Sequence, residues 1–149
     1  MKREIKFRAL KSHEGRFIWI YGLLIYDTDG QTPMIQAVNP FNPSLFYTCM
    51  VGTECQFTGL KDEKDREIYD GDIYFDEIEE DDGDVRLYYV CKWIDEWARF
   101  VWLNVDGELQ DYEDNGVENF IDYNFVLETK RMHYAGNIYE NPELLKSVY

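Results

Sequence analysis

Alternation of apolar and polar residues, which is typical of a strand with one solvent-facing side, recurs along most of this chain. Near its start, Ile5, Phe7 and Ala9 alternate with Lys6 and Arg8. Further short strands are predicted at residues 34–38, 45–50, 73–78, 85–93, 97–105, 125–127 and 131–135. Turn-forming residues, Gly, Asp and Asn above all, separate several of these segments. The pattern therefore predicts a mainly β protein built from antiparallel sheets.

Residues 17–26 are apolar at almost every position and follow a basic start, as the hydrophobic part of a signal peptide does. No cleavage site of small residues comes after them, because the polar turn at residues 27–30 follows directly. Ten residues are also about half of the roughly 20 that a membrane-spanning helix needs. We therefore interpret residues 17–26 as a buried, central strand, apolar on both faces.

Two short signals predict how other parts of the chain turn or coil. Asp106-Gly107, flanked by apolar residues, predicts a tight hairpin. Near the C-terminal end, Asn141 suits the N-cap of a helix, Pro142 its first position, and Glu143 its positive end. The sequence therefore predicts one short terminal helix on an otherwise β protein.

Residues 59–72 form a polar, turn-rich stretch between two richer in apolar residues. This predicts an N-terminal β subdomain of residues 1–58 and a C-terminal subdomain of residues 59–149 that carries the terminal helix; one compact domain is the alternative. Gly71-Asp72-Ile73, which enters an apolar strand, is similar to the opening of a small SH3-like barrel. A small barrel is therefore expected in the C-terminal half.

The amino-acid composition adds support for β-sheet and limits the classes of partner that the protein can bind. Aromatic residues make up 17% of the chain, a bias that suits pleated, half-buried surfaces. Thirty acidic and fifteen basic side chains give a net charge of −15, and six of the basic ones lie in the first sixteen residues. Such a surface repels nucleic-acid phosphates and anionic membranes, so neither direct nucleic-acid binding nor membrane association is expected.

Residues 76–84 carry the densest run of charge. Its members are Asp76, Glu77, Glu79, Glu80, Asp81, Asp82 and Asp84. We interpret the run as a solvated acidic loop that keeps the protein soluble, which is the usual role of such runs. The alternative is a surface that binds a partner.

The residues that commonly carry catalysis or bind metals are scarce. Cys49, Cys55 and Cys91 form no C-x-x-C pair, and the chain has only His13 and His133, so zinc lacks ligands at a usual spacing. No P-loop, G-x-S-x-G, G-x-G-x-x-G or H-E-x-x-H motif occurs. Acidic turns at 27–30 and 82–84 lack the order of a calcium loop. No cofactor, metal or catalytic residue is predicted.

We interpret the cysteines as reduced, mostly buried thiols of a cytosolic protein. His133 is interpreted as a packed or surface side chain. Trp93, Trp97 and Trp102 are compatible with a base-stacking platform, but their surroundings are acidic, and core packing is the better interpretation.

Four segments carry a resemblance when taken together and in order. They are REIKFRA at residues 3–9, QFTGLKD at 56–62, REIYDGDI at 66–73 and GNIYENPELL at 136–145. Taken as an ordered set, they resemble the YopX family of phage and prophage proteins. The resemblance implies a mostly β fold and a phage accessory role, and it brings no defined biochemical activity and no catalytic residues.

The motif residues have a structural interpretation as turns, a helix start and a core. Glycines are expected at turns with positive φ, and aspartates are expected to bond backbone amides there. The motif residues are Gly59, Leu60, Asp62, Ile68, Tyr69, Gly71, Asp72, Gly136, Asn137, Tyr139, Asn141 and Pro142. We expect them to build the scaffold.

Three hypotheses of function follow. The first is a non-enzymatic phage accessory protein that acts through protein–protein contacts in the bacterial cytoplasm, with an unknown partner or as a homo-oligomer. The second is an acidic mimic of DNA that inhibits a host nucleic-acid-binding protein. The third is an enzyme with an unrecognised carboxylate site. A contiguous acidic strip would favour the mimic, and a pocket with converging carboxylates would favour the enzyme.

Overall fold

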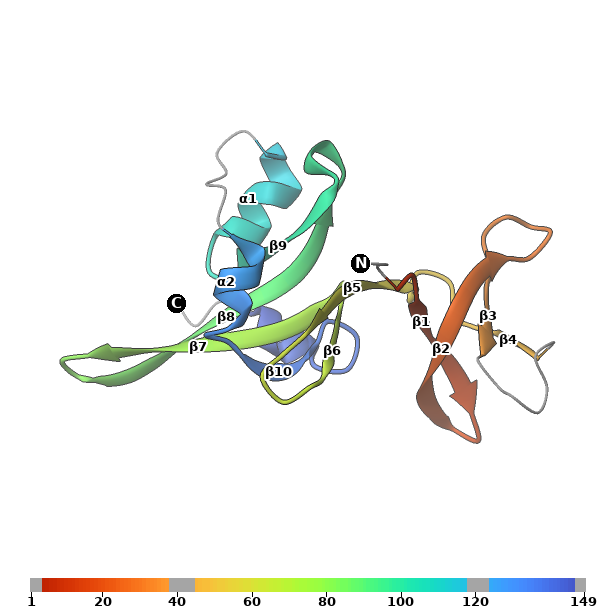
Figure 1. Ribbon diagram of the computed structural model, residues 1–149, viewed down its shortest axis with the longest axis horizontal. Coiled ribbons are helices and arrows are strands. Elements are labelled where there is room, and N and C mark those ends of the chain that lie inside the picture. The colour runs from red at the N-terminus through yellow and green to blue at the C-terminus, as the bar shows by residue number, and fades with distance from the viewer. Residues whose placement is uncertain (1–3, 38–44, 118–123, 147–149) are drawn as a thin grey trace. The chain divides into compact units, whose positions relative to one another are not determined.

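The protein is mainly β, and its strands pair in antiparallel fashion, as the alternation predicts (Figure 1). The computed structural model describes residues 4–37, 45–117 and 124–146. The chain divides into two compact units, Met1–Gly59 and Leu60–Tyr149.

The first unit is built on an antiparallel sheet. Its strands are β1 (Phe7–His13), β2 (Arg16–Tyr26), β3 (Pro33–Ala37), β4 (Phe46–Thr48) and β5 (Cys55–Lys61), which runs past the unit boundary. The sheet order is β4-β3-β2-β1-β5-β6, where β6 is Glu67–Tyr69. Glu14 and Gly15, with φ of 49° and 76°, form the β1–β2 turn. Two positive φ values suit the tight turns whose twist matches a hairpin.

Strand β2 occupies the predicted central position, but the prediction that it is buried is wrong. Ile20 and Leu24 pack against Ala9 and Ile35 on one face of the sheet. Most of the other β2 side chains are exposed. The physical reason is that the described residues of the first unit form no helix, and a strand apolar on both faces needs a layer on each side to be buried.

The second unit holds an open sheet of order β10-β7-β8-β9. Its strands are β7 (Asp72–Glu80), β8 (Gly83–Ile94), β9 (Arg99–Asn104) and β10 (His133–Asn137), with a 3₁₀ turn at Asp95–Trp97. Because β10 and β9 end this order without pairing to each other, the sheet is not a closed barrel. The expectation of an SH3-like barrel is therefore wrong.

Two helices lie where strands or turns are predicted. Helix α1 (Glu108–Asn115) follows Asp106-Gly107, so the predicted hairpin is wrong. The Glu108 carboxylate accepts a hydrogen bond from the Asn104 N–H (3.0 Å) and so fixes this helical start. Helix α2 (Phe125–Thr129) replaces the strand predicted at residues 125–127, and the Asn124 side chain caps it by accepting from the Leu127 N–H (3.1 Å).

The terminal helix is a 3₁₀ helix, Pro142–Leu145. Pro142 is its first residue, as predicted, but the Asn141 side chain does not cap it. Asn141 Oδ1 instead accepts a hydrogen bond from the Asn137 N–H (3.2 Å), so the predicted N-cap is wrong.

Trp102 lies in the core of the second unit. It is 3% exposed, stacks on Phe125 at 5.1 Å between ring centroids, and lies 5.0 Å from Tyr74. Its indole N–H donates to Thr129 Oγ1 (2.9 Å). Core packing, rather than a base-stacking surface, therefore accounts for this tryptophan.

Candidate functional site

The turn between β5 and β6 is tied to the sheet of the second unit by Asp62. Asp62 Oδ1 accepts hydrogen bonds from the backbone N–H groups of Lys64 (2.9 Å) and Arg66 (3.0 Å). Asp62 Oδ2 accepts from the Tyr74 hydroxyl (2.8 Å). Burial, followed by this contact with Asp62, raises the pKa of the Tyr74 phenol well above its usual value. The phenol therefore stays protonated and donates to the turn.

The next motif turn leads from β6 to β7. Asp72 is 1% exposed, and its Oδ2 accepts from the Tyr69 N–H (2.8 Å). Gly71 has φ of 86°; its N–H donates to the Cys91 carbonyl (2.8 Å), and its carbonyl accepts from the Ile138 N–H (2.9 Å). Gly71 thus joins β8 to the segment that follows β10.

The last motif closes a compact turn after β10. Asn137 is 2% exposed, and its Oδ1 accepts from the N–H groups of Tyr139 (3.0 Å) and Glu140 (2.9 Å). Gly136 has φ of 158°, and a Cβ added there would collide with the Asn141 side chain. The turn therefore needs glycine at this position.

The other motif residues lie in turns or in the core. Gly59 has φ of 87°, and Ile68 is fully buried in a cluster against which Leu60 packs. Tyr69 is 1% exposed, and Tyr139 is half-buried. The motif aspartates and asparagines thus accept hydrogen bonds from backbone N–H groups, and Leu60 and Ile68 pack in an apolar cluster.

The acidic run lies on a hairpin, so the predicted acidic loop is wrong. Asp76, Glu77, Glu79 and Glu80 belong to β7, Asp84 belongs to β8, and Asp81 and Asp82 form the turn between the strands. Cross-strand pairs hold the hairpin together, among them Ile78 opposite Val85. In Figure 1 its tip extends away from α1, α2 and β10. We call residues 76–87 the acidic arm.

Charge on the acidic arm is divided between two faces. Glu77 and Glu79 point to one face, where Arg86 pairs with Glu77 (3.0 Å) and Asp84 lies opposite Glu79. Residues 76, 78 and 80 point to the other face. Carboxylates on one face of a strand are about 7 Å apart, whereas each DNA strand places a phosphate about every 3.4 Å along the axis. The acidic arm therefore falls short of the charge density of a duplex.

Two carboxylates do converge, at a cavity of about 220 Å³ in the second unit. Glu108 of α1 and Glu128 of α2 line it together with Tyr89, Trp102 and Arg131. The sequence interpretation missed this cavity because neither helix was predicted. The capping pattern at Asn124 is a signal that would have located α2. Ser, Thr, Cys and His are absent from this lining, so its groups capable of acid–base or nucleophilic chemistry are the two carboxylates and the Tyr89 phenol.

Burial raises the pKa of Glu128 to about 7; nearby Arg131 opposes this rise, and Glu108 adds to it. Because the folded carboxyl holds its proton more tightly than the unfolded one, its contribution to stability is present at low pH and is lost as pH rises from about 4.5 to 7. We expect Glu128→Gln to stabilise the protein by about 1 kcal/mol at pH 8, after discounting for solvent screening, and to change little at pH 4.

Urea denaturation at the two pH values measures this difference. The matched control is Glu113→Gln, an exposed change on α1. Equal effects of Glu128→Gln at pH 4 and pH 8 would show that the Glu128 carboxyl does not titrate in this range.

A second cavity, of about 270 Å³, lies beside the Asp62 turn. Arg66 lines it and stacks over the Tyr134 ring at 3.8 Å. His133 also lines it, is exposed, and packs against Phe75 at 5.3 Å between rings. His133 is therefore a surface side chain packed on an aromatic ring, in agreement with its interpretation.

Among the residues that the structure describes, the largest set of exposed apolar side chains lies on strand β2. Phe17, Tyr21, Leu23 and Ile25 alternate along it and are 62%, 44%, 52% and 43% exposed. Leu23 lies beside Gln36 of β3, which pairs with Phe46 of β4, a residue 39% exposed. Alternation places all of them on the face opposite Ile20 and Leu24. We call this surface, Phe17, Tyr21, Leu23, Ile25 and Phe46, the outer face of β2.

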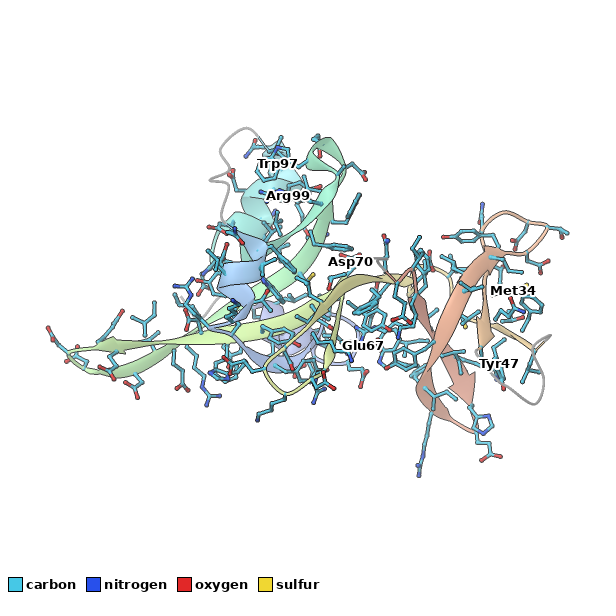
Figure 2. All side chains as sticks on the ribbon, in the orientation of Figure 1. Met34, Tyr47, Glu67, Asp70, Trp97 and Arg99 are labelled. Carbon is cyan, nitrogen blue, oxygen red and sulfur yellow. The ribbon has the colours of Figure 1, made fainter. Side chains whose placement is uncertain are left out.

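A charged side chain covers part of this side of the sheet, beside the outer face. Trp19, also on it, is half-buried beneath Arg8, whose guanidinium lies 4.2 Å from the ring centroid. Figure 2 shows Met34 on β3 and Tyr47 on β4; by register, Met34 is beside Ile25, and Tyr47 is on the opposite face. On this side of the sheet, β2 is apolar from Phe17 to Ile25, whereas β3 and β4 each present one apolar and one polar side chain, Met34 with Gln36 and Phe46 with Thr48.

The cysteines, the metal-binding side chains and the helices bear on the remaining predictions from the sequence. Cys49, Cys55 and Cys91 are all buried, as predicted, and no disulfide joins them. Within the described residues, no group of three or more His, Cys, Asp or Glu side chains is arranged to hold a metal ion. No helix in that part of the chain is long and apolar enough to cross a membrane.

The comparisons with known proteins agree with this fold. The crystal structure of protein EF1440 from Enterococcus faecalis is similar, with a TM-score of 0.54 and 22% sequence identity over 97% of this chain and 100% of that one. No curated protein matches the chain. The family described as "YopX protein" matches residues 6–146, nearly the whole chain. The chain therefore belongs to the YopX family.

Proposed function

We propose that this protein is a phage or prophage accessory protein that acts through protein–protein contacts, and that the outer face of β2 is the contact surface. The observation that carries the proposal is the exposure of Phe17 (62%) and Leu23 (52%) within a row of apolar side chains that alternate along one side of β2. A fully exposed large apolar side chain presents roughly 150–250 Å², so the outer face presents about 450 Å². Exposed apolar patches of this size commonly mark interaction sites.

The grouping of these apolar residues on one side of a sheet distinguishes the outer face from ordinary surface exposure. Single exposed apolar residues are common and need no explanation. Here five of them share one side of a sheet, and strands β2, β3 and β4 contain no acidic residue in a chain of net charge −15. A region without carboxylates on such a chain is suited to a partner that brings apolar surface of its own.

The two alternatives are less well supported by the geometry. The acidic arm divides its carboxylates between two faces and pairs Glu77 with Arg86, which weakens the case for a DNA mimic. The cavity brings the Glu108 and Glu128 carboxylates together, but Glu108 already accepts a hydrogen bond from the Asn104 N–H at the start of α1, which gives it a structural role. Buried thiols that form no disulfide support the bacterial cytoplasm as the place of action.

Photo-crosslinking in bacterial cells that produce the protein tests the proposal. A benzoylphenylalanine is placed at Leu23 on the outer face, or at Val126, which has nearly the same exposure (49%) but lies on α2. We expect protein adducts from position 23 and few from position 126, because exposure is matched and only the surroundings differ.

A third probe, at Glu80 of the acidic arm, separates the mimic from the main proposal. Adducts with a nucleic-acid-binding protein at position 80, together with none at position 23, would favour the mimic. Equal adduct yields at positions 23 and 126 would contradict a dedicated contact surface on β2.

A further inference from the structure

We propose that a second copy of this chain covers the outer face of β2, so that two sheets pack face to face across a two-fold axis. The inference rests on the proposed function, because it takes the outer face to be a protein contact surface. It goes further by naming the occupant and the geometry. The contact is isologous, in that each copy presents the same surface to the other.

The first support is the lack of a helix layer packed against the outer face of β2. A sheet buries an apolar face only against a second layer, and sheets that pack face to face lie about 10 Å apart with interdigitating side chains. In the described residues of the first unit, no helix is present to serve as that layer. A second copy supplies a sheet with the same spacing and the same apolar side chains.

The second support is charge. Residues 1–59 carry six Lys or Arg and five Asp or Glu, a formal charge of +1, whereas residues 60–149 carry nine and twenty-five, a formal charge of −16. Two first units therefore meet with little repulsion, and β2, β3 and β4 bury no carboxylate between them. A basic partner would instead be drawn to the second unit.

The third support is area. Two outer faces together remove about 900 Å² of side-chain surface from water, and the half-buried Met34 and Gln36 between them extend the contact. This approaches the roughly 1,000 Å² needed for a specific interface. A single face of about 450 Å² comes near that size only when its partner brings an equally large apolar surface.

Sedimentation velocity of the purified full chain over a range of concentrations tests the inference. We expect a monomer–dimer equilibrium that Leu23→Lys weakens by roughly tenfold or more, because it places a charge at the centre of the contact. Val126→Lys is the matched control and should leave the equilibrium unchanged. Far-ultraviolet circular dichroism confirms that each variant is folded, and Ile25→Lys repeats the test at a second position on the same face.

Salt gives an independent readout. Each copy carries −15, so screening by salt should strengthen an apolar contact between copies. A dimer that dissociates as salt rises would instead depend on contacts between opposite charges and would overturn the inference. A dimer unchanged by both Leu23→Lys and Ile25→Lys would overturn it as well.

Failure of the inference is distinguishable from failure of the proposed function. A wild-type chain that stays monomeric at high concentration shows that no second copy occupies the face. Crosslinks from position 23 to other proteins would then still support a protein contact surface on β2. Absence of crosslinks there, together with a monomeric chain, would contradict both.

Discussion

Replacing Gly136 by alanine should destabilise the second unit by about 3 kcal/mol. Two effects combine at this position. The residue has φ of 158°, which side chains rarely adopt, and the added Cβ would collide with the Asn141 side chain. Because Asn137, the next residue, is buried and holds the turn after β10, the collision cannot be relieved without breaking hydrogen bonds of that turn. Urea denaturation followed by tryptophan fluorescence measures the loss.

Two variants separate collision from backbone strain. Gly83→Ala, at the acidic arm, has positive φ (119°) but nothing within 4 Å of the added Cβ, so it should cost about 1 kcal/mol. Asn141→Ala removes the colliding group and the bond to the Asn137 N–H. The double variant Gly136→Ala/Asn141→Ala should be less destabilised than the sum of the single changes. Simple additivity would show that the two side chains do not compete for space.

Asp62→Ala is expected to cost about 3 kcal/mol, the second large effect. The change removes the acceptor for two backbone N–H groups, at Lys64 and Arg66, and for the hydroxyl of the fully buried Tyr74. Hydrogen bonds to a charged group contribute more than neutral ones, and a buried donor left without its acceptor adds a desolvation penalty. The denaturation midpoint of the second unit is the measurement.

Tyr74→Phe and Asp62→Asn are the controls for this prediction. Tyr74→Phe removes only the donor and should cost about 1 kcal/mol. Asp62→Asn keeps one acceptor oxygen for the turn and should fall between the two. If Asp62→Ala costs no more than Tyr74→Phe, the two bonds within the turn contribute little to stability.

Strands were predictable from sequence because period-two alternation is a local signal. Segments 73–78 and 85–93 lie within β7 and β8, which pair with each other in the structure. Helix α2 was not predictable in the same way, since a short apolar run such as residues 125–127 fits a strand or a helix equally well. Asn124 before this run is the sequence signal that favours a helix, and its side chain accepts from the Leu127 N–H in the structure.

Burial and the candidate site were harder to predict than the strands. An apolar sequence at residues 17–26 indicates a strand that is suited to two covering layers, but it does not reveal whether the same chain supplies both. Glu108 and Glu128, which meet at the cavity, lie 20 residues apart in sequence and on different helices, so no motif spacing indicates the cavity. The charge run at residues 76–84 is equally ambiguous. Ile78 is its one apolar residue before the turn, so the seven carboxylates hide the apolar–polar alternation that would have indicated a strand.

The position of β10 has a consequence for how the second unit folds. β7, β8 and β9 are consecutive strands that pair with short connections, whereas β10 pairs with β7 through residues 58 apart in sequence, His133 and Phe75. Pairing over such a separation is slow, because a long loop must close first. Until β10 arrives, β7 is an open strand edge, the feature through which partly folded chains associate wrongly. Charged side chains from Asp76 to Glu80 on that same edge should then act as its protection during synthesis, since like charges keep neighbouring nascent chains apart.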